Sequence, residues 1–90
     1  MNEVYTKEQL INIRNNLSLI SINALDVLKI IQDEPKITNK DLIYKSNLGK
    51  SVVDKCIAAY LASGLVNRID DGIKRMYVLT KDGENILSLS

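Results

Sequence analysis

The sequence predicts a mainly helical domain that carries a small β-hairpin, an α+β arrangement. Two observations support this class. Apolar residues recur at three- and four-residue spacing as far as Ser63, and two strand-like segments follow Gly64. The chain has 90 residues, which is enough for one hydrophobic core. Its 46% hydrophobic and 26% charged residues are typical of a folded protein, so a disordered chain is not expected.

The first helix is predicted to begin after Thr6, which forms a capping-box pattern with Gln9. One apolar stripe then follows at helical spacing, made of Leu10, Ile13, Leu17 and Ile20. Several residues after position 14 are poor in helix interiors and favourable as caps, so we expect a break among Asn15, Asn16, Ser18 and Ser21. A second helix is expected over about 22–33, and Pro35 ends it.

Two shorter helices are expected in the middle of the chain. Thr38 caps a helix over 39–46, and residues 47–49 form a tight turn. A fourth helix runs over 50–63, and Gly64 supplies its left-handed C-terminal cap. Cys56 lies on the apolar side of that helix, where it is expected to be a buried small side chain.

The remaining segment changes to a strand-like pattern over 65–69 and 73–79, with Asp71-Gly72 as a hairpin signal between them. Thr80 is expected to cap a last helix over 81–89, which gives the order α-α-α-α-β-β-α. A two-residue turn at Asp71-Gly72 would place Arg68 opposite Arg75. These two arginines would repel each other by some tenths of a kcal/mol. A phosphate between them, or Arg75 leaning toward Asp70, would relieve the repulsion.

Two short helices joined by a tight turn and followed by a hairpin form a winged helix-turn-helix. Residues 42–66 resemble the DNA-reading half of winged-helix regulators of the MarR and PadR type. Residues 48–53 are similar to their turn and the start of the recognition helix, and 64–66 to their exit into the wing. Residues 77–83 are similar to the segment that follows the wing. The resemblance covers about 22–88 and implies a DNA-binding transcriptional regulator.

Charge supports a DNA-binding face, because residues 36–75 hold eight basic and four acidic side chains. Helix 50–63 would enter the major groove, and hairpin 66–79 would lie along the backbone as a wing. The candidate DNA-binding residues are Tyr44, Lys45, Lys50, Ser51, Val52, Lys55, Arg68, Lys74 and Arg75. The outer side of the helix lacks Arg, Asn and Gln, which read bases with two hydrogen bonds, so direct base readout should be limited.

The N-terminal stripe adds apolar surface beyond what one small core needs. We therefore divide the chain into an N-terminal dimerisation helix, 1–21, and a DNA-binding domain, 22–90, within one compact unit. The expected homodimer contacts are Leu10, Ile13, Leu17, Ile20, Ile86 and Leu89. The alternative is that the first helix folds back on its own core. A dimer would present two recognition helices about one DNA turn apart.

Other functions stay open. The protein could coat DNA and spread along it, as winged-helix chromatin proteins and plasmid-segregation adaptors do. It could also be a winged-helix protein–protein interaction module that binds no DNA. An enzyme is not expected, because the sequence has no histidine and a single cysteine. We likewise expect no cofactor, no metal site and no membrane segment or signal peptide, and hence a cytoplasmic, nucleoid-associated protein.

Overall fold

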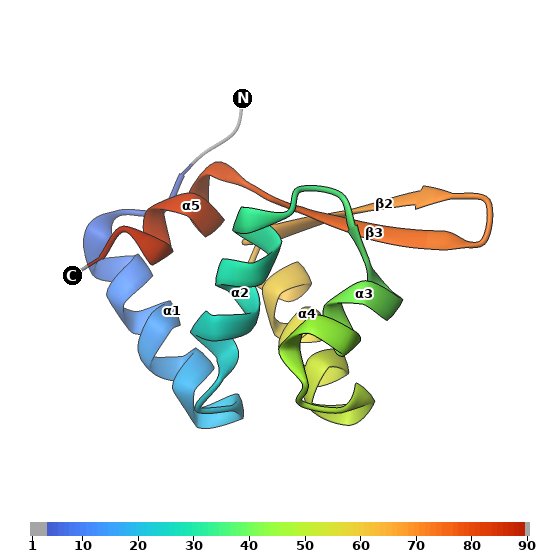
Figure 1. The fold of residues 1–90 in the computed structure, drawn as a ribbon. Coiled ribbons are helices and arrows are strands. Elements are labelled where there is room, and N and C mark those ends of the chain that lie inside the picture. The colour runs from blue at the N-terminus through green and yellow to red at the C-terminus, as the bar shows by residue number, and fades with distance from the viewer. Residues whose placement is uncertain (1–3, 90) are drawn as a thin grey trace.

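The computed structural model describes residues 4–89, which form helices packed against a small sheet (Figure 1). In chain order the elements are α1 (Lys7–Ile20), α2 (Ala24–Asp33), β1 (Ile37–Thr38), α3 (Asn39–Ser46), α4 (Lys50–Ala62), β2 (Val66–Asp71), β3 (Lys74–Leu79) and α5 (Lys81–Leu87). The mainly helical class with a hairpin is therefore confirmed. The structure adds one short strand, β1, that the sequence pattern did not indicate.

Threonine caps start three of the helices, as the sequence predicts. The Gln9 backbone N–H donates to Thr6 Oγ1 at 3.1 Å, and the Thr6 N–H donates to Gln9 Oε1 at 2.9 Å, which completes the capping box. Thr38 and Thr80 accept the equivalent bonds at the starts of α3 and α5, each at 3.1 Å. These caps satisfy N–H groups that have no partner inside the helix.

The break expected within residues 15–21 is wrong for most of that segment. α1 continues through Asn15, Asn16 and Ser18 as far as Ile20, and α2 begins only at Ala24. Burial explains the continuity. Leu10 and Leu17 lie on one side of α1 and are both inside the core, so tertiary packing outweighs the weak helix propensity of the polar residues between them.

The sheet has the order β1-β3-β2, and both strand pairs are antiparallel. β1 is only two residues long, and it follows a turn in which Lys36 has a φ of +66°. The Lys36 N–H donates to the carbonyl oxygen of Tyr77 at 2.9 Å, which fastens this turn to β3. β2 and β3 form the predicted wing, which projects away from the helices in Figure 1.

The turn of the wing differs from the prediction by one residue. Asp71 pairs with Lys74, so the two turn residues are Gly72 and Ile73 rather than Asp71 and Gly72. Gly72 has a φ of +62°. A glycine at the first central position is what a type II′ hairpin turn requires, and this explains why the turn is displaced. The displacement changes every cross-strand neighbour in the wing.

The core lies where α2, α4 and the sheet meet. Leu28, Ile31 and Tyr60 are fully buried there, and the Tyr60 hydroxyl donates to the carbonyl oxygen of Ala24. Gly83 allows α5 to approach the start of the wing. A Cβ on this residue would lie 2.2 Å from the carbonyl oxygen of Leu65, so any side chain would displace the helix.

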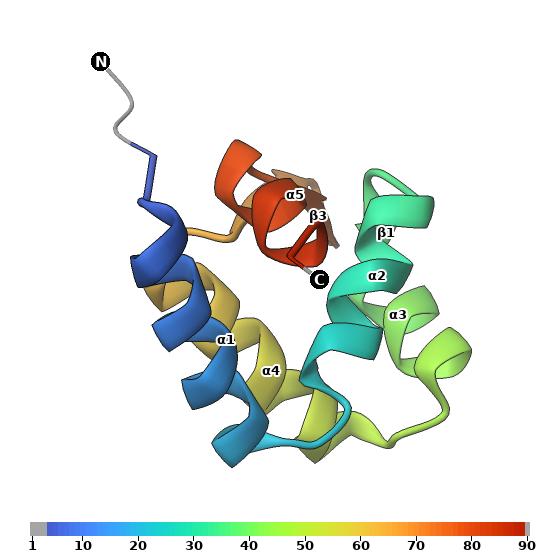
Figure 2. The same cartoon turned by 90° about the vertical axis from the view of Figure 1, so that its left-hand side faces the viewer.

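The segment before α1 joins distant parts of the chain. The Tyr5 N–H donates to Asp82 Oδ1 at 2.9 Å, and the Tyr5 hydroxyl donates to the carbonyl oxygen of Ser63 at 2.7 Å. Figure 2 shows the result: α1 lies beside α4, with α5 above it. Within residues 4–89, no helix has the length and apolar character needed to cross a membrane.

Candidate nucleic-acid interface

The helix-turn-helix consists of α3, the turn 47–49 and α4. Leu42 on α3 and Val53 on α4 are fully buried, so the core fixes the position of both helices. The turn uses two unusual backbone conformations: Asn47 is left-handed with a φ of +56°, and Gly49 has a φ of +86°. Asparagine and glycine tolerate positive φ best, which explains why these residue types stand here.

The start of α4 is polar and open. Lys50, Ser51 and Lys55 are exposed, and Val52 is half-buried against the core. Lys50 Nζ lies 2.5 Å from Asp54 Oδ2, one turn further along the same helix. No side chain caps the helix at Gly49, and its first turn holds no acidic residue. Its free N–H groups and the positive end of the helix dipole therefore add to the lysine charges.

The candidate residues on α3 behave differently from each other. The Tyr44 side chain is 83% exposed and points into solvent. Lys45 forms an ion pair with Glu34, which follows α2, and this hydrogen bond raises the pKa of Lys45. The pairing holds Lys45 toward α2, so its charge is already partly neutralised. Lys40, which the prediction did not include, is exposed on the same helix.

The predicted contact between Arg68 and Arg75 is wrong. Arg68 lies opposite Tyr77, and Arg75 lies opposite Asp70, because the turn is one residue further along. Arg68 Nε instead donates to Asp70 Oδ1 at 2.8 Å. Arg68 and then Arg75 hold the pKa of Asp70 below its usual value. The argument for a phosphate between two repelling arginines therefore no longer applies.

The tip of the wing is exposed but nearly balanced in charge. Lys74 and Arg75 are both exposed, and each lies opposite an aspartate, Asp71 and Asp70 respectively. Ile73 stands fully in solvent at the turn. The wing therefore presents cations that have acidic neighbours, whereas Lys55 on α4 has no ion pair with any described residue.

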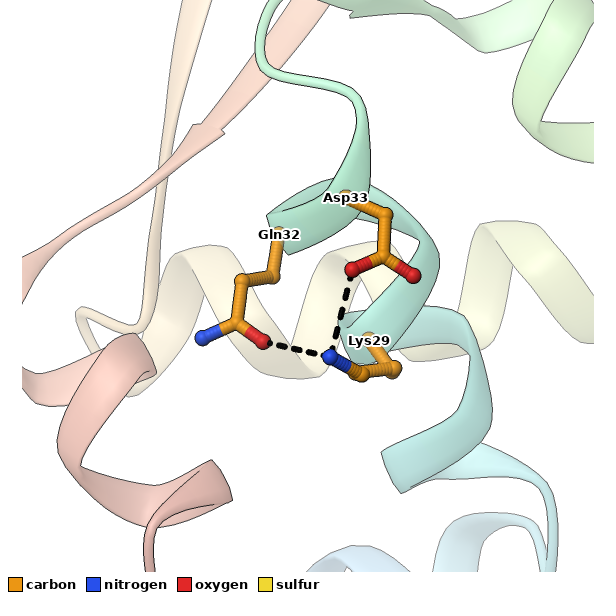
Figure 3. A network of polar contacts seen from close by, with 3 residues as sticks. All are labelled: Lys29, Gln32 and Asp33. Atoms are coloured by element: carbon orange, nitrogen blue, oxygen red, sulfur yellow. Dashed lines mark hydrogen bonds and ion pairs between the residues drawn. The ribbon is translucent and has the colours of Figure 1, made fainter.

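Lys29 lies on α2, outside the helix-turn-helix, and its charge is neutralised within its own helix. Its Nζ donates to Gln32 Oε1 at 3.0 Å and to Asp33 Oδ1 at 3.2 Å (Figure 3). Both acceptors lie three and four residues further along α2, which is the spacing of neighbours on a helix surface. Lys29 is thus an exposed lysine that does not join the candidate interface.

The residues expected at a dimer interface do not share one surface. Leu10, Leu17 and Ile86 are buried in the core of this chain, so the expectation that they form spare apolar surface is wrong. Ile13 and Leu89 are half-buried against the same core. Ile20 alone of the six is exposed, at 43%. α1 thus folds back on its own core, the alternative that the sequence left open.

Apolar side chains do remain outside the core at the turn between α1 and α2. Leu19 is 84% exposed and Ile22 is 89% exposed, on either side of Ser21. Together with Ile20 they form an apolar corner, a name kept below for Leu19, Ile20 and Ile22. The sequence signal for it was the apolar content of α1 beyond one stripe, although the pattern did not show which residues would be left outside.

Residues 4–89 hold neither a group of metal ligands nor an exposed thiol. No three His, Cys, Asp or Glu side chains among residues 4–89 are grouped so that they could hold a metal ion. Cys56 is fully buried, as predicted, and burial raises the pKa of its thiol. A buried protonated thiol is unreactive.

Comparison with solved structures finds the same fold in known proteins. MarR matches with a TM-score of 0.70 at 20% sequence identity, over 91% of this chain and 64% of MarR. The transcriptional regulator SlyA matches with a TM-score of 0.67 at 14% identity, over 90% of this chain and 66% of SlyA. Reduced HlyU from Vibrio cholerae N16961 matches with a TM-score of 0.61 at 16% identity, over 89% of this chain and 90% of HlyU.

The chain thus spans just under two thirds of the length of MarR and SlyA. No family model matches the sequence, and no curated protein matches it at a significant level. The likeness at these identities is one of fold, so the PadR part of the resemblance stays a prediction. The chain has the winged helix-turn-helix fold that MarR, SlyA and HlyU share.

Proposed function

We propose that this protein is a transcriptional regulator that binds double-stranded DNA as a homodimer. α4 enters the major groove, and the β2–β3 wing lies along the sugar–phosphate backbone. The observation that carries the proposal is the exposed side of α4, which is small and basic and begins at an uncapped helix N-terminus. The shared fold with the transcriptional regulator SlyA supports the same role.

The side chains on α4 suit close approach to a duplex. The major groove is about 12 Å wide and admits one helix. Ser51 and Ala58 are exposed and short, so the helix backbone can lie near the base edges. Lys55 has no ion pair with a described residue. Lys50 can exchange the Asp54 carboxylate for a phosphate because the Lys50 side chain is 74% exposed and the Asp54 side chain is 42% exposed.

Sequence discrimination by this helix should be weak. Lysine binds phosphate as a point charge, whereas recognition of guanine or adenine usually needs Arg, Asn or Gln with two hydrogen bonds. The exposed positions of α4 hold none of these three residue types. This observation favours a second candidate function, in which many copies coat DNA without strong sequence preference.

The homodimer requires a different surface from the one that the apolar stripe suggested. Leu10 and Leu17 are buried within the chain, but the apolar corner is open to solvent. Burying an exposed leucine or isoleucine side chain contributes about 1.5–3 kcal/mol. We therefore place the dimer contact at Leu19, Ile20 and Ile22, in continuity with the predicted contact at Ile20.

Fluorescence anisotropy on a random duplex across a salt series tests the proposal. Binding should appear at low salt and weaken linearly in log–log form as salt rises. Lys55→Glu should weaken binding about tenfold and lower the salt slope by about 0.9, the value for one phosphate contact. Lys29→Glu is the matched control, because it makes the same charge change on an exposed lysine outside the helix-turn-helix.

The possible results separate the three functions. If the Lys55→Glu and Lys29→Glu variants bind equally well, α4 is not the DNA-binding face. If the unaltered protein ignores DNA at low salt, the protein–protein module takes its place. A footprint that stays at one length as protein is added indicates a regulator, and a footprint that lengthens indicates a coating protein.

A further inference from the structure

β2 is an edge strand with one long side open. The sheet order β1-β3-β2 puts β3 on one side of β2 and no described strand on the other. β2 is six residues long, without proline and without a bulge in its register with β3. A regular exposed edge is a template for pairing with another strand, and folded proteins usually cover or interrupt it.

The outward backbone groups of β2 can be assigned from β3. The Lys36 N–H donates to the carbonyl oxygen of Tyr77, so the backbone of Tyr77 faces β1. Arg68 lies opposite Tyr77 and is therefore in a pair without β2–β3 backbone bonds. Since the pattern alternates, Arg68 and Asp70 both direct their N–H and C=O groups outward. No other described segment bonds these groups.

The charged side chains on this edge are complementary to those of a second copy of β2 in one register. An antiparallel pair with a second β2 must match outward residues with outward residues. A pairing centred on Arg68 places two arginines opposite each other, and one centred on Asp70 places two aspartates opposite each other. A pairing centred on Asn67 needs Val66, which is buried in the core. Only the pairing centred on Ile69 puts Arg68 opposite an aspartate, and it does so twice.

We infer that β2 is a second self-association surface, which binds β2 of another copy antiparallel with Ile69 at the two-fold axis. Arg68 faces the partner's Asp70, and Asp70 faces the partner's Arg68. These two pairs exchange four backbone hydrogen bonds. Opposite charges directly across strands are attractive, so the residues that deter other pairings favour this one.

The wing projects beyond the helices (Figure 1), and Ile69 belongs to its strand β2. Because the two strands run in opposite directions, the body of each copy lies beyond the wing tip of the other. The Arg68 and Asp70 side chains are 42% and 56% exposed, so both can reach a partner. This surface is distinct from the apolar corner and does not depend on DNA binding.

Charge exchange tests the pairing. Sedimentation equilibrium is measured in the Leu19→Ser/Ile22→Ser background, so that association through the apolar corner is not counted. Asp70→Arg alone and Arg68→Asp alone should each weaken association about tenfold, because each creates two like-charge pairs. An equal mixture of these two variants should regain the parent affinity, since every Arg then meets an Asp of the other variant. A circular dichroism spectrum confirms that each variant is folded.

A disulfide tests the register. In a Cys56→Ala background, Ile69→Cys should form a disulfide-linked dimer under mild oxidation. The two Cα atoms of a pair without backbone bonds lie about 4.5 Å apart, within disulfide range. Asn67→Cys is the matched control: it lies on the same face of β2, but it faces the partner's Asp71 and should not cross-link.

Three results would overturn the inference. They are an apolar-corner variant that stays monomeric at high concentration, a mixture that associates no better than its components, or cross-linking of Asn67→Cys at the rate of Ile69→Cys. DNA anisotropy of the Asp70→Arg variant is measured in parallel. If the parent protein associates through β2 but does not bind DNA, only the proposed function has failed; if it binds DNA and Asp70→Arg leaves association unchanged, only the β2 pairing has failed.

Discussion

Two corners of this chain have the same length and opposite chemistry. Residues 21–23 join α1 to α2, and residues 47–49 join α3 to α4. Both turns lie at the same end of the molecule (Figure 1). The first corner exposes Leu19 and Ile22, whereas the second exposes Asn47, Gly49 and Lys50. Loop length therefore does not define the role of a helical corner. The side chains beside the turn do.

The two corners also differ in how the backbone turns. The first is held by a side chain, because the Asn23 N–H donates to Ser21 Oγ at 3.1 Å. The second is held by backbone conformation, with positive φ angles at Asn47 and Gly49. Asparagine and glycine adopt positive φ readily, so the second corner can be made of small polar residues without a large apolar side chain. The first corner needs no residue with positive φ, so apolar side chains can stand at the ends of its two helices.

The largest expected effect on stability distinguishes the buried side of α1 from its exposed side. Leu17→Ala should lower the free energy of unfolding by about 2–5 kcal/mol, because Leu17 is buried in the core. Leu19→Ala removes the same atoms two residues away and should change it by no more than about 0.5 kcal/mol. Urea unfolding followed by circular dichroism measures both. Equal losses would mean that the apolar corner is part of the core after all.

Gly49→Ala should destabilise the protein by straining the backbone of the second corner. The φ of +86° and ψ of 158° fall in a region that glycine alone adopts readily, which costs other residues about 1–3 kcal/mol. No atom lies within 4 Å of the added Cβ, so the loss measures strain rather than a clash. Thermal unfolding gives the loss, and an unchanged midpoint would show that the turn adapts freely.

The Leu19→Ser/Ile22→Ser double variant removes the apolar surface of the first corner. Self-association through that corner should weaken about tenfold or more, because two aliphatic side chains no longer contribute the free energy of burying their apolar surface. The unfolding free energy should hardly change, because both residues are exposed. Sedimentation equilibrium in an Asp70→Arg background isolates this contact. Unchanged association in that background would remove the corner from the dimer.

Asp54→Asn gives the smallest effect and acts near the second corner. It frees Lys50 from its ion pair and removes one negative charge from α4, so affinity for a random duplex should rise about threefold. Asp26→Asn is the control, since it removes an exposed carboxylate from α2. An equal gain from both would indicate an effect of net charge alone.

Local signals predicted the elements better than they predicted their neighbours. Thr6, Thr38 and Thr80 cap helices as expected, because capping depends on residues within one turn. The wing turn was misplaced by one residue, since Asp71-Gly72 and Gly72-Ile73 both contain the glycine that a hairpin turn needs. β1 has two residues and hence no periodicity to detect.

The candidate site shows the same limit. The i,i+4 spacing of Lys50 and Asp54 is visible in the sequence, but the ion pair between Lys45 and Glu34 forms only when α2 and α3 pack together. Whether Leu17 or Leu19 is buried likewise depends on how α1 rotates against α2 and α4. Pairwise contacts across the fold decide which charged and apolar side chains are left for a partner.

The Tyr5 contacts have a consequence for how the chain folds. They join Tyr5 to residues 58 and 77 positions further along, so nearly the whole chain must close into a loop before the start of α1 is anchored. Closing long loops costs entropy and slows folding. During synthesis, the bond from Tyr5 to Asp82 therefore forms only after Asp82 has left the ribosome, although α1 can already pack on α2 and α4 through Leu10 and Leu17. The segment before the first helix is thus made first and fastened last.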